Sequence, residues 1–83
     1  MKIRILLKEA REKKGYNYSQ MGKLLKLSSH TPYLLIETCK REASIQMWKK
    51  IQKILEIKDS NMWIVITTYK YVENPSKNNK INI

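Results

Sequence analysis

Catalytic and metal-binding chemistry require residue types that are scarce in this chain. Its 83 residues include one histidine, His30, and one cysteine, Cys39, and its seven aspartates and glutamates offer no paired carboxylates. Acid–base or nucleophilic catalysis needs several such groups in one place, and a metal site needs a cluster of cysteine and histidine ligands. We therefore expect a protein that is not an enzyme and that holds no metal and no cofactor.

Positive charge is the strongest chemical signal in the sequence. Seventeen lysines and arginines stand against seven acidic residues, which gives a formal net charge of +10. A charge of this size favours a polyanionic partner, nucleic acid first and an anionic membrane surface second. Simple solubility is the alternative explanation.

The expected location of the protein is the cytoplasm of a bacterial or phage-infected cell. No apolar run approaches the roughly 18 residues of a membrane span, so we expect no membrane partner. A single cysteine cannot form an intrachain disulfide, which fits a reducing compartment. The frequent lysine, isoleucine and asparagine are typical of an AT-rich bacterial or phage genome.

The segment best suited to contact a nucleic acid is LKLSSHTPYLLIE, residues 25–37. An apolar stripe before it predicts a short helix over 18–25. Thr31 followed by Pro32 is a typical helix start, because a hydroxyl caps the helix and proline lacks an N–H that would stay unpaired there. A second helix is expected over 32–38. Two short helices joined by a polar turn on a basic chain indicate a helix-turn-helix, although the spacing fits an ordinary αα-corner equally well.

Two longer helices complete the predicted bundle. Apolar residues at helical spacing predict a helix over 2–14 that ends at Gly15. Ser44 is a good N-cap for a helix over 45–56, in which Trp48 has the spacing of a core residue. The outer face of the first helix is expected to carry Lys2, Arg4, Lys8, Arg11, Lys13 and Lys14. The predicted fold class is all-α, a compact bundle of four to five helices.

The C-terminal part of the chain has a different composition. Residues 64–72, IVITTYKYV, are rich in β-branched and aromatic residues and favour a strand. A lone strand needs a partner, so it either pairs with the same strand of a second subunit or is in reality a helix packed on the bundle. We therefore divide the chain into a helix-turn-helix domain over 1–60, a possible dimerisation element over 61–74, and a flexible tail over 75–83.

Two blocks of the sequence resemble a known family. LKEAREKKG, followed by YNYSQMGKLL, and IETCKREASI, followed by QMWKKIQKIL, are similar to the lambda-repressor-like helix-turn-helix regulators of the Cro/CI or Xre type. The resemblance covers about residues 3–57. Where the family has glycine in the helix-turn-helix turn and after its second helix, this chain has Lys26 and Cys39. A left-handed lysine would cost roughly 1 kcal/mol. Gly22, in place of the usual alanine, indicates a close approach by another helix.

The resemblance implies roles for individual residues. Arg11 and Glu37 would form an internal ion pair that holds the first helix to the third. Phosphate contacts would come from the start of the second helix and the turn after the third, and base contacts from the joint and the helix that follows it. The implied DNA-binding residues are Asn17, Tyr18, Ser28, Ser29, His30, Thr31, Leu34, Lys40 and Arg41.

The expected function is therefore sequence-specific binding of double-stranded DNA by a small transcriptional regulator of the phage-repressor or antitoxin type. Such proteins act as homodimers that read two half-sites about 34 Å apart. The alternative is a protein-interaction module on the same fold, an antirepressor or adaptor, because Leu34 and Leu35 make the expected recognition helix unusually apolar.

Overall fold

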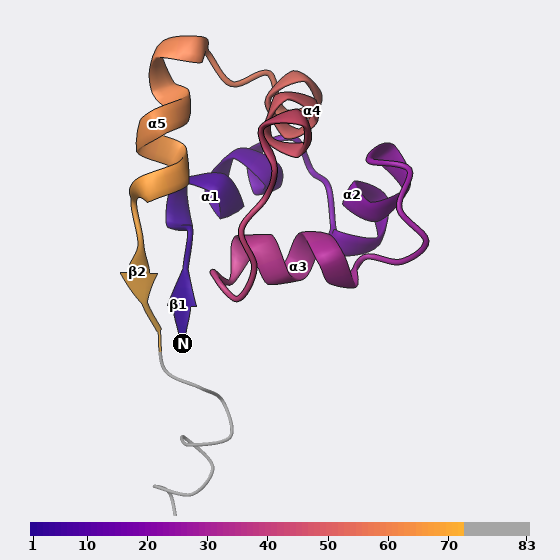
Figure 1. The fold of residues 1–83 in the computed structure, drawn as a ribbon, viewed down its shortest axis with the longest axis horizontal. Helices are drawn as coiled ribbons and strands as arrows, with labels where there is room; N and C mark the ends of the chain where they lie inside the picture. The colour runs from indigo at the N-terminus through magenta and orange to yellow at the C-terminus, as the bar shows by residue number, and fades with distance from the viewer. Residues whose placement is uncertain (73–83) are drawn as a thin grey trace, which may run out of the picture.

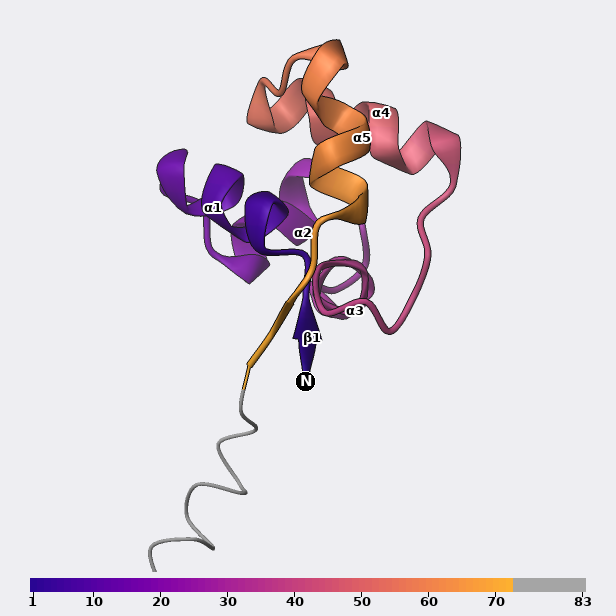
Figure 2. The same ribbon diagram turned by 90° about the vertical axis from the view of Figure 1, so that its left-hand side faces the viewer.

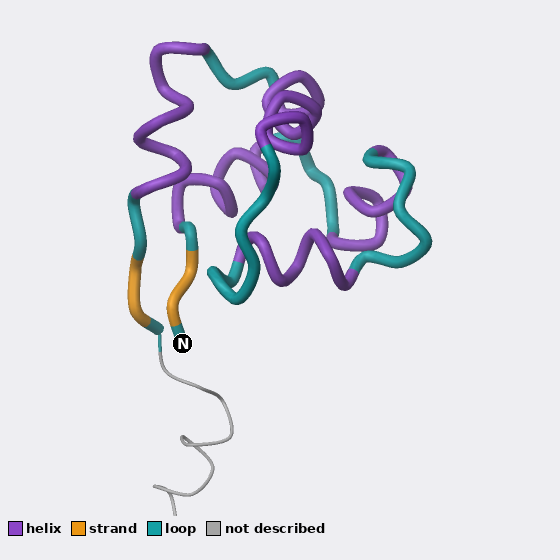
Figure 3. The backbone as a smooth tube through the Cα atoms, in the orientation of Figure 1, coloured by secondary structure: helices purple, strands orange, loops and turns teal. Residues whose placement is uncertain are grey.

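The described residues begin and end with short strands that lie side by side, with five helices between them (Figure 1). The computed structural model describes residues 1–72. Their elements are β1 (Lys2–Ile3), α1 (Ile5–Lys13), α2 (Tyr18–Leu24), α3 (Thr31–Glu37), α4 (Ile45–Leu55), α5 (Asp59–Thr67) and β2 (Lys70–Tyr71). Helices make up most of the regular structure, as Figure 3 shows, in agreement with the expected all-α class. The predicted tail over 75–83 lies outside the described residues.

The first helix starts later than its apolar stripe predicted. Residues 2–3 belong to β1, which pairs antiparallel with β2 so that Lys2 lies opposite Tyr71 and Ile3 opposite Lys70. Helical hydrogen bonding begins only where the Lys8 amide donates to the carbonyl oxygen of Arg4 at 3.0 Å. The prediction of a helix over 2–14 is therefore wrong at its N-terminus, because β2 supplies the backbone partners that the first residues need.

The C-terminal segment combines the two structures that the sequence left open. Residues 59–67 form α5, and only residues 70–71 form a strand. Val65 is buried against the core, so tertiary packing outweighs the strand preference of the β-branched residues around it. The strand pairs with β1, at the N-terminus of its own chain.

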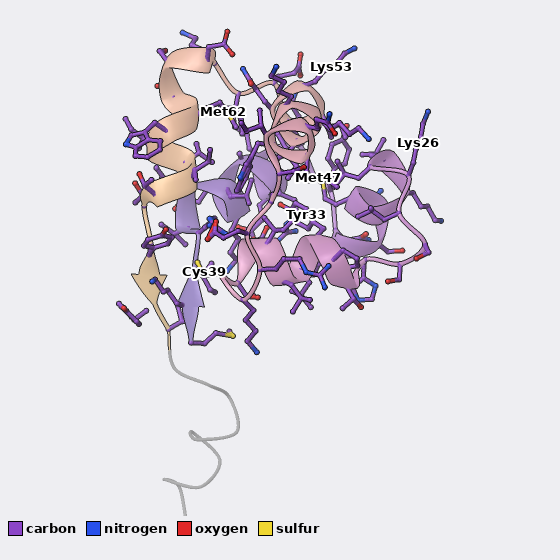
Figure 4. All side chains as sticks on the ribbon, in the orientation of Figure 1. Lys26, Tyr33, Cys39, Met47, Lys53 and Met62 are labelled. Carbon is purple, nitrogen blue, oxygen red and sulfur yellow. The ribbon has the colours of Figure 1, made fainter. Side chains whose placement is uncertain are left out.

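One hydrophobic core joins all five helices. Figure 2 shows α3 end-on with α4 and α5 above it. Figure 4 shows Tyr33 and Met47 in the space between α3 and α4. Trp48 is buried, as its helical spacing predicted. The buried core residues are Leu7, Met21, Leu25, Tyr33, Ile36, Trp48, Ile51, Leu55 and Val65. None of the described helices is long and apolar enough to cross a membrane.

Candidate nucleic-acid interface

Three side chains donate hydrogen bonds to the fully buried carboxylate of Glu37, at the C-terminal end of α3. Arg11 of α1 donates from Nε to Oε1 at 2.9 Å and from Nη2 to Oε2 at 3.3 Å. Tyr18 of α2 donates to Oε2 at 2.6 Å, and Tyr33 donates to Oε1 at 2.9 Å. The structure thus brings together the expected ion pair, and the two tyrosines add a link to α2. These bonds set the position of α3 relative to α1 and α2.

The same network shifts the acidity of its members. Burial, together with the hydrogen bond to Glu37, raises the pKa of Tyr18 to about 12. Burial, together with the negative charge of Glu37, also raises the pKa of Tyr33. For Arg11, burial lowers the pKa, but the hydrogen bond and charge of Glu37 outweigh it and the net shift is upward. At neutral pH both tyrosines therefore remain protonated donors, and the arginine remains a cation.

The connection between α2 and α3 is built around two close backbone contacts. Leu27 donates to the carbonyl oxygen of Gly22 at 2.9 Å and Lys26 donates to that of Lys23 at 3.0 Å, which is the Schellman arrangement. Lys26 has φ 59°, so this lysine adopts the left-handed conformation that favours glycine. A Cβ atom on Gly22 would lie 3.0 Å from the Cα atom of His30, so the turn backbone before α3 makes the close approach, and the expectation of another helix beside Gly22 is wrong.

The start of α3 differs from the predicted cap. Thr31 is the first residue of the helix, and its N-cap is His30, whose carbonyl oxygen accepts from the Leu34 amide at 3.0 Å. His30 makes no capping bond with its side chain. The prediction of Thr31 as the N-cap is therefore wrong, because helical bonding begins one residue earlier, where the backbone packs on Gly22.

Most of the expected DNA-binding residues lie on the surface. At the start of α2, Asn17 forms a capping box with Gln20, in which the Asn17 carboxamide oxygen accepts from the Gln20 amide at 2.8 Å. Leu34 is half-buried. Tyr18 is also half-buried, and its hydroxyl points inward to Glu37. The exposed members of the expected set are Asn17, Ser28, Ser29, His30, Thr31, Lys40 and Arg41.

A buried arginine that the sequence did not single out also fastens the C-terminal end of α3. Arg4, expected on the outer face of a helix, has no exposed surface. Its Nη1 donates to the carbonyl oxygen of Ile36 at 2.5 Å and its Nε to that of Ile66 at 2.9 Å. Its Nη2 lies 2.8 Å from both carboxylate oxygens of Glu42. The expectation of an outward Arg4 is wrong because residues 2–4 are not helical. Its side-chain partners lie more than thirty residues away in the sequence, so no local sequence pattern predicts them.

The described residues also contain a second basic surface. Lys26, Lys50 and Lys53 line a shallow pocket between the end of α2 and α4. Figure 4 shows Lys26 and Lys53 on the side of the molecule opposite the free edge of α3. The charge of the chain is therefore distributed over two sides, and these lysines are natural controls for any experiment on α3.

Nothing else in the described residues suggests a bound group. Within 1–72, no group of three or more histidine, cysteine, aspartate or glutamate side chains is arranged to hold a metal ion. Comparison of the chain with family models, with curated proteins and with solved structures finds no match.

Proposed function

We propose that the protein binds double-stranded DNA sequence-specifically, as a small transcriptional regulator of the lambda-repressor-like helix-turn-helix type, with α3 in the major groove. The observation that carries this proposal is the joint over 28–31, four consecutive exposed residues at the N-terminal end of a helix that is fixed to the bundle from both sides. The major groove is about 12 Å wide and admits one α-helix, and a recognition helix reads bases with its N-terminal residues.

The fixation of α3 supports the proposal because base reading requires a rigid helix. The Glu37 network ties α3 to α1 and α2, and Arg4 ties its C-terminal turn to α5 and the following loop. In Figure 1, α3 lies at the lower edge of the bundle with α1 and α4 above it, and no helix covers its lower side. A duplex can approach α3 from that side.

The proposed contacts fall into two classes. Ser29, His30 and Thr31 read base edges, and Leu34 contacts thymine methyl groups. Phosphates are held by Asn17 and by the exposed cations after α3, namely Lys40 and Arg41. Tyr18 is left out of this set, because its hydroxyl already donates to Glu37.

The proposal includes a homodimer, since two copies of α3 about 34 Å apart would match a two-fold symmetric operator. The proposed dimer contact is through β2, whose pairing with β1 of the same chain occupies one of its two edges in the described residues. Sedimentation equilibrium, with and without duplex DNA, measures whether the dimer forms in solution or on the operator.

The deciding experiment is selection of bound sequences from a random duplex pool, followed by titrations at several salt concentrations. We expect enrichment of a two-fold symmetric site and an affinity that falls steeply with salt, because phosphate contacts release counterions. Ser29→Ala and His30→Ala should each reduce discrimination against a mismatched base by roughly 1–3 kcal/mol. Ser60→Ala, an exposed serine at the start of α5, is the matched control. Failure to enrich any sequence would refute the proposal.

One observation favours the protein-interaction alternative, on a different surface from α3. A groove of about 520 Å³ between α1 and α5 has an apolar floor that includes Leu6 and Ile64. Three lysines, Lys13, Lys14 and Lys58, line the same groove. Trp63, next in sequence to Ile64, is 73% exposed. Apolar surface with a basic rim fits an acidic amphipathic helix of another protein, and the like charges disfavour a second copy of this chain.

A designed amphipathic peptide with glutamate on its polar face is the probe for this alternative. We expect micromolar binding by isothermal titration calorimetry that Ile64→Ala weakens at least tenfold and that Tyr71→Ala, at an exposed residue outside the groove, leaves unchanged. Equal binding by both variants would exclude this groove as the docking site.

A further inference from the structure

The β1–β2 sheet projects from the bundle beside the C-terminal end of α3. In Figure 1 the two strands descend below the level of α3, on the side that faces away from α4 and α5. The view turned by 90° in Figure 2 also places β1 below α3. A duplex that lies against the uncovered side of α3 therefore meets this sheet as well.

Backbone and side-chain bonds fix the sheet rigidly to α3. The Arg4 amide, directly after β1, donates to the carbonyl oxygen of Glu37 at 2.8 Å. The guanidinium of the same residue donates to the carbonyl oxygen of Ile36, the last but one residue of α3. At the other end of the sheet, the amino group of Met1 donates to the carbonyl oxygen of Val72 at 2.8 Å, and the Val72 amide donates back to Met1 at 2.7 Å. The sheet thus keeps a defined position relative to the proposed recognition helix.

The sheet is basic and contributes little to the core. Of its four residues, only Ile3 is buried, while Lys70 and Tyr71 are exposed. Lys2 is held over the ring of Tyr69, with Nζ 4.2 Å from the ring centroid, which limits the directions that its ammonium group can take.

The neighbouring turn adds to this positive charge. Lys40 and Arg41 follow the same end of α3, and Figure 4 shows Cys39, which precedes them, beside β1. Glu42 comes next in the chain, but both of its carboxylate oxygens accept from Arg4. Lys70 is exposed and Lys2 is half-buried, and both add to this charge.

We propose that the β1–β2 sheet is a second DNA-contacting element, in which Lys2 and Lys70 bind backbone phosphates beside the groove that α3 enters. This inference rests on the proposed function, and it extends the interface beyond the helix-turn-helix. Phosphate is the expected ligand, because a lysine ammonium group lacks the planar guanidinium that binds a base edge at two points. The two lysines also extend the positive charge of Lys40 and Arg41. The sheet therefore adds affinity and helps to fix the position of the protein along the duplex, whereas the joint over 28–31 supplies sequence preference.

The test compares lysines that differ only in their place on the molecule. Three variants are titrated onto the selected operator and onto random duplex at several salt concentrations. They are Lys70→Gln, the double variant Lys2→Gln/Lys70→Gln, and the control Lys53→Gln on α4. The slope of log affinity against log salt should become less steep by about 0.9 for each phosphate that the variant no longer neutralises. We expect the single Lys70 variant to bind roughly 3–10-fold more weakly at low salt on both DNAs. Its preference for the operator should be unchanged.

Hydroxyl-radical footprinting locates the phosphates that the sheet binds. Wild type should protect backbone positions that flank the α3 footprint, and in the double variant this flanking protection alone should disappear. His30→Ala should show the reverse behaviour, with reduced preference and an unchanged salt slope.

The outcomes separate the two proposals. If wild type selects an operator but Lys70→Gln and Lys53→Gln behave alike, the sheet proposal is overturned and the helix-turn-helix proposal stands. A larger drop in affinity from Lys53→Gln would place the phosphates at α4 and would also overturn the sheet proposal. If wild type binds no duplex, both proposals fail.

Discussion

The guanidinium of Arg11 and the carboxylate of Glu37 form a two-point contact inside the protein, with Nε 2.9 Å from Oε1 and Nη2 3.3 Å from Oε2. The Glu37 side chain has no exposed surface and that of Arg11 is 7% exposed. Both carboxylate oxygens also accept from tyrosine hydroxyls. A buried charge is tolerated in a small protein when its polar atoms are paired in this way.

Glu37→Gln is expected to destabilise the protein by about 3–5 kcal/mol, because it leaves the Arg11 cation buried without a partner. Equilibrium urea unfolding followed by tryptophan fluorescence measures the change. Glu12→Gln removes an exposed carboxylate from α1 and should change stability by less than about 0.5 kcal/mol. Equal stabilities of the two variants would show that the network contributes nothing to the fold.

Arg4→Met is expected to lower the free energy of unfolding by about 2–4 kcal/mol. The substitution leaves the carbonyl oxygen of Ile66 without its guanidinium donor and that of Ile36 with only the Cys39 amide, at 3.3 Å, and a buried unpaired acceptor costs about 1–3 kcal/mol. It also removes the guanidinium link between β1 and α3 and leaves only the backbone bond from residue 4 to Glu37, so hydrogen exchange of the Val72 amide should accelerate more than that of the Ile51 amide in the core. Lys13→Met, on the exposed face of α1, is the control and should have little effect. A small effect of Arg4→Met would mean that water replaces the guanidinium without loss of stability.

The contrast between Arg11 and Arg4 shows what could be predicted from the sequence. The partner of Arg11 was expected because the chain resembles a family in which this spacing carries an ion pair. Nothing in the local pattern around Arg4 points to Ile66, 62 residues later. The apolar stripe that begins at Ile3 fits a helix as well as a buried strand residue, so periodicity extended the first helix too far.

The candidate site was anticipated in its position but not in its local geometry. The exposed polar joint was expected from residue type and spacing. The start of α3 at Thr31 was not predicted, because it is determined by the packing of Gly22 against His30, and a cap motif does not encode that packing. Similarly, α5 is helical over residues whose local preference is for strand, because packing of Val65 into the core decides the outcome.

Substituting glycine at left-handed helix ends should stabilise the protein. Four helices end with a residue at positive φ, and only Gly15 among these residues is a glycine. The others are Lys26, Cys39 and Glu56, with φ of 59°, 60° and 54°. Each non-glycine residue there carries a steric cost of roughly 1 kcal/mol, so Lys26→Gly and Glu56→Gly should each raise the free energy of unfolding by about 0.5–1 kcal/mol.

The reverse substitution is the control for this series. Gly15→Ala has free space for the added methyl group but a φ of 77°, so it should be destabilising by about 1 kcal/mol through backbone strain alone. Thermal and urea unfolding measure all three variants. Destabilisation by both glycine substitutions would show that the side chains at these positions contribute more than the strain costs.

The raised pKa of Tyr18 predicts a loss of stability at alkaline pH. The pKa of this residue is about 12 in the folded protein, against an ordinary value of 10.0. A group whose pKa is raised by folding contributes its full stabilisation below the unfolded pKa and loses it as the pH rises through the folded one. The contribution is therefore complete below about pH 10 and is lost between about pH 10 and 12.

Urea unfolding of wild type and Tyr18→Phe between pH 8 and 12 measures this linkage. The variant lacks the hydrogen bond to Glu37 and should be less stable at pH 8, but its stability should fall less steeply above pH 10. The two curves should therefore converge as the pH rises. Parallel curves would mean that Tyr18 titrates alike in the folded and unfolded chains, and that its bond to Glu37 does not favour the protonated hydroxyl.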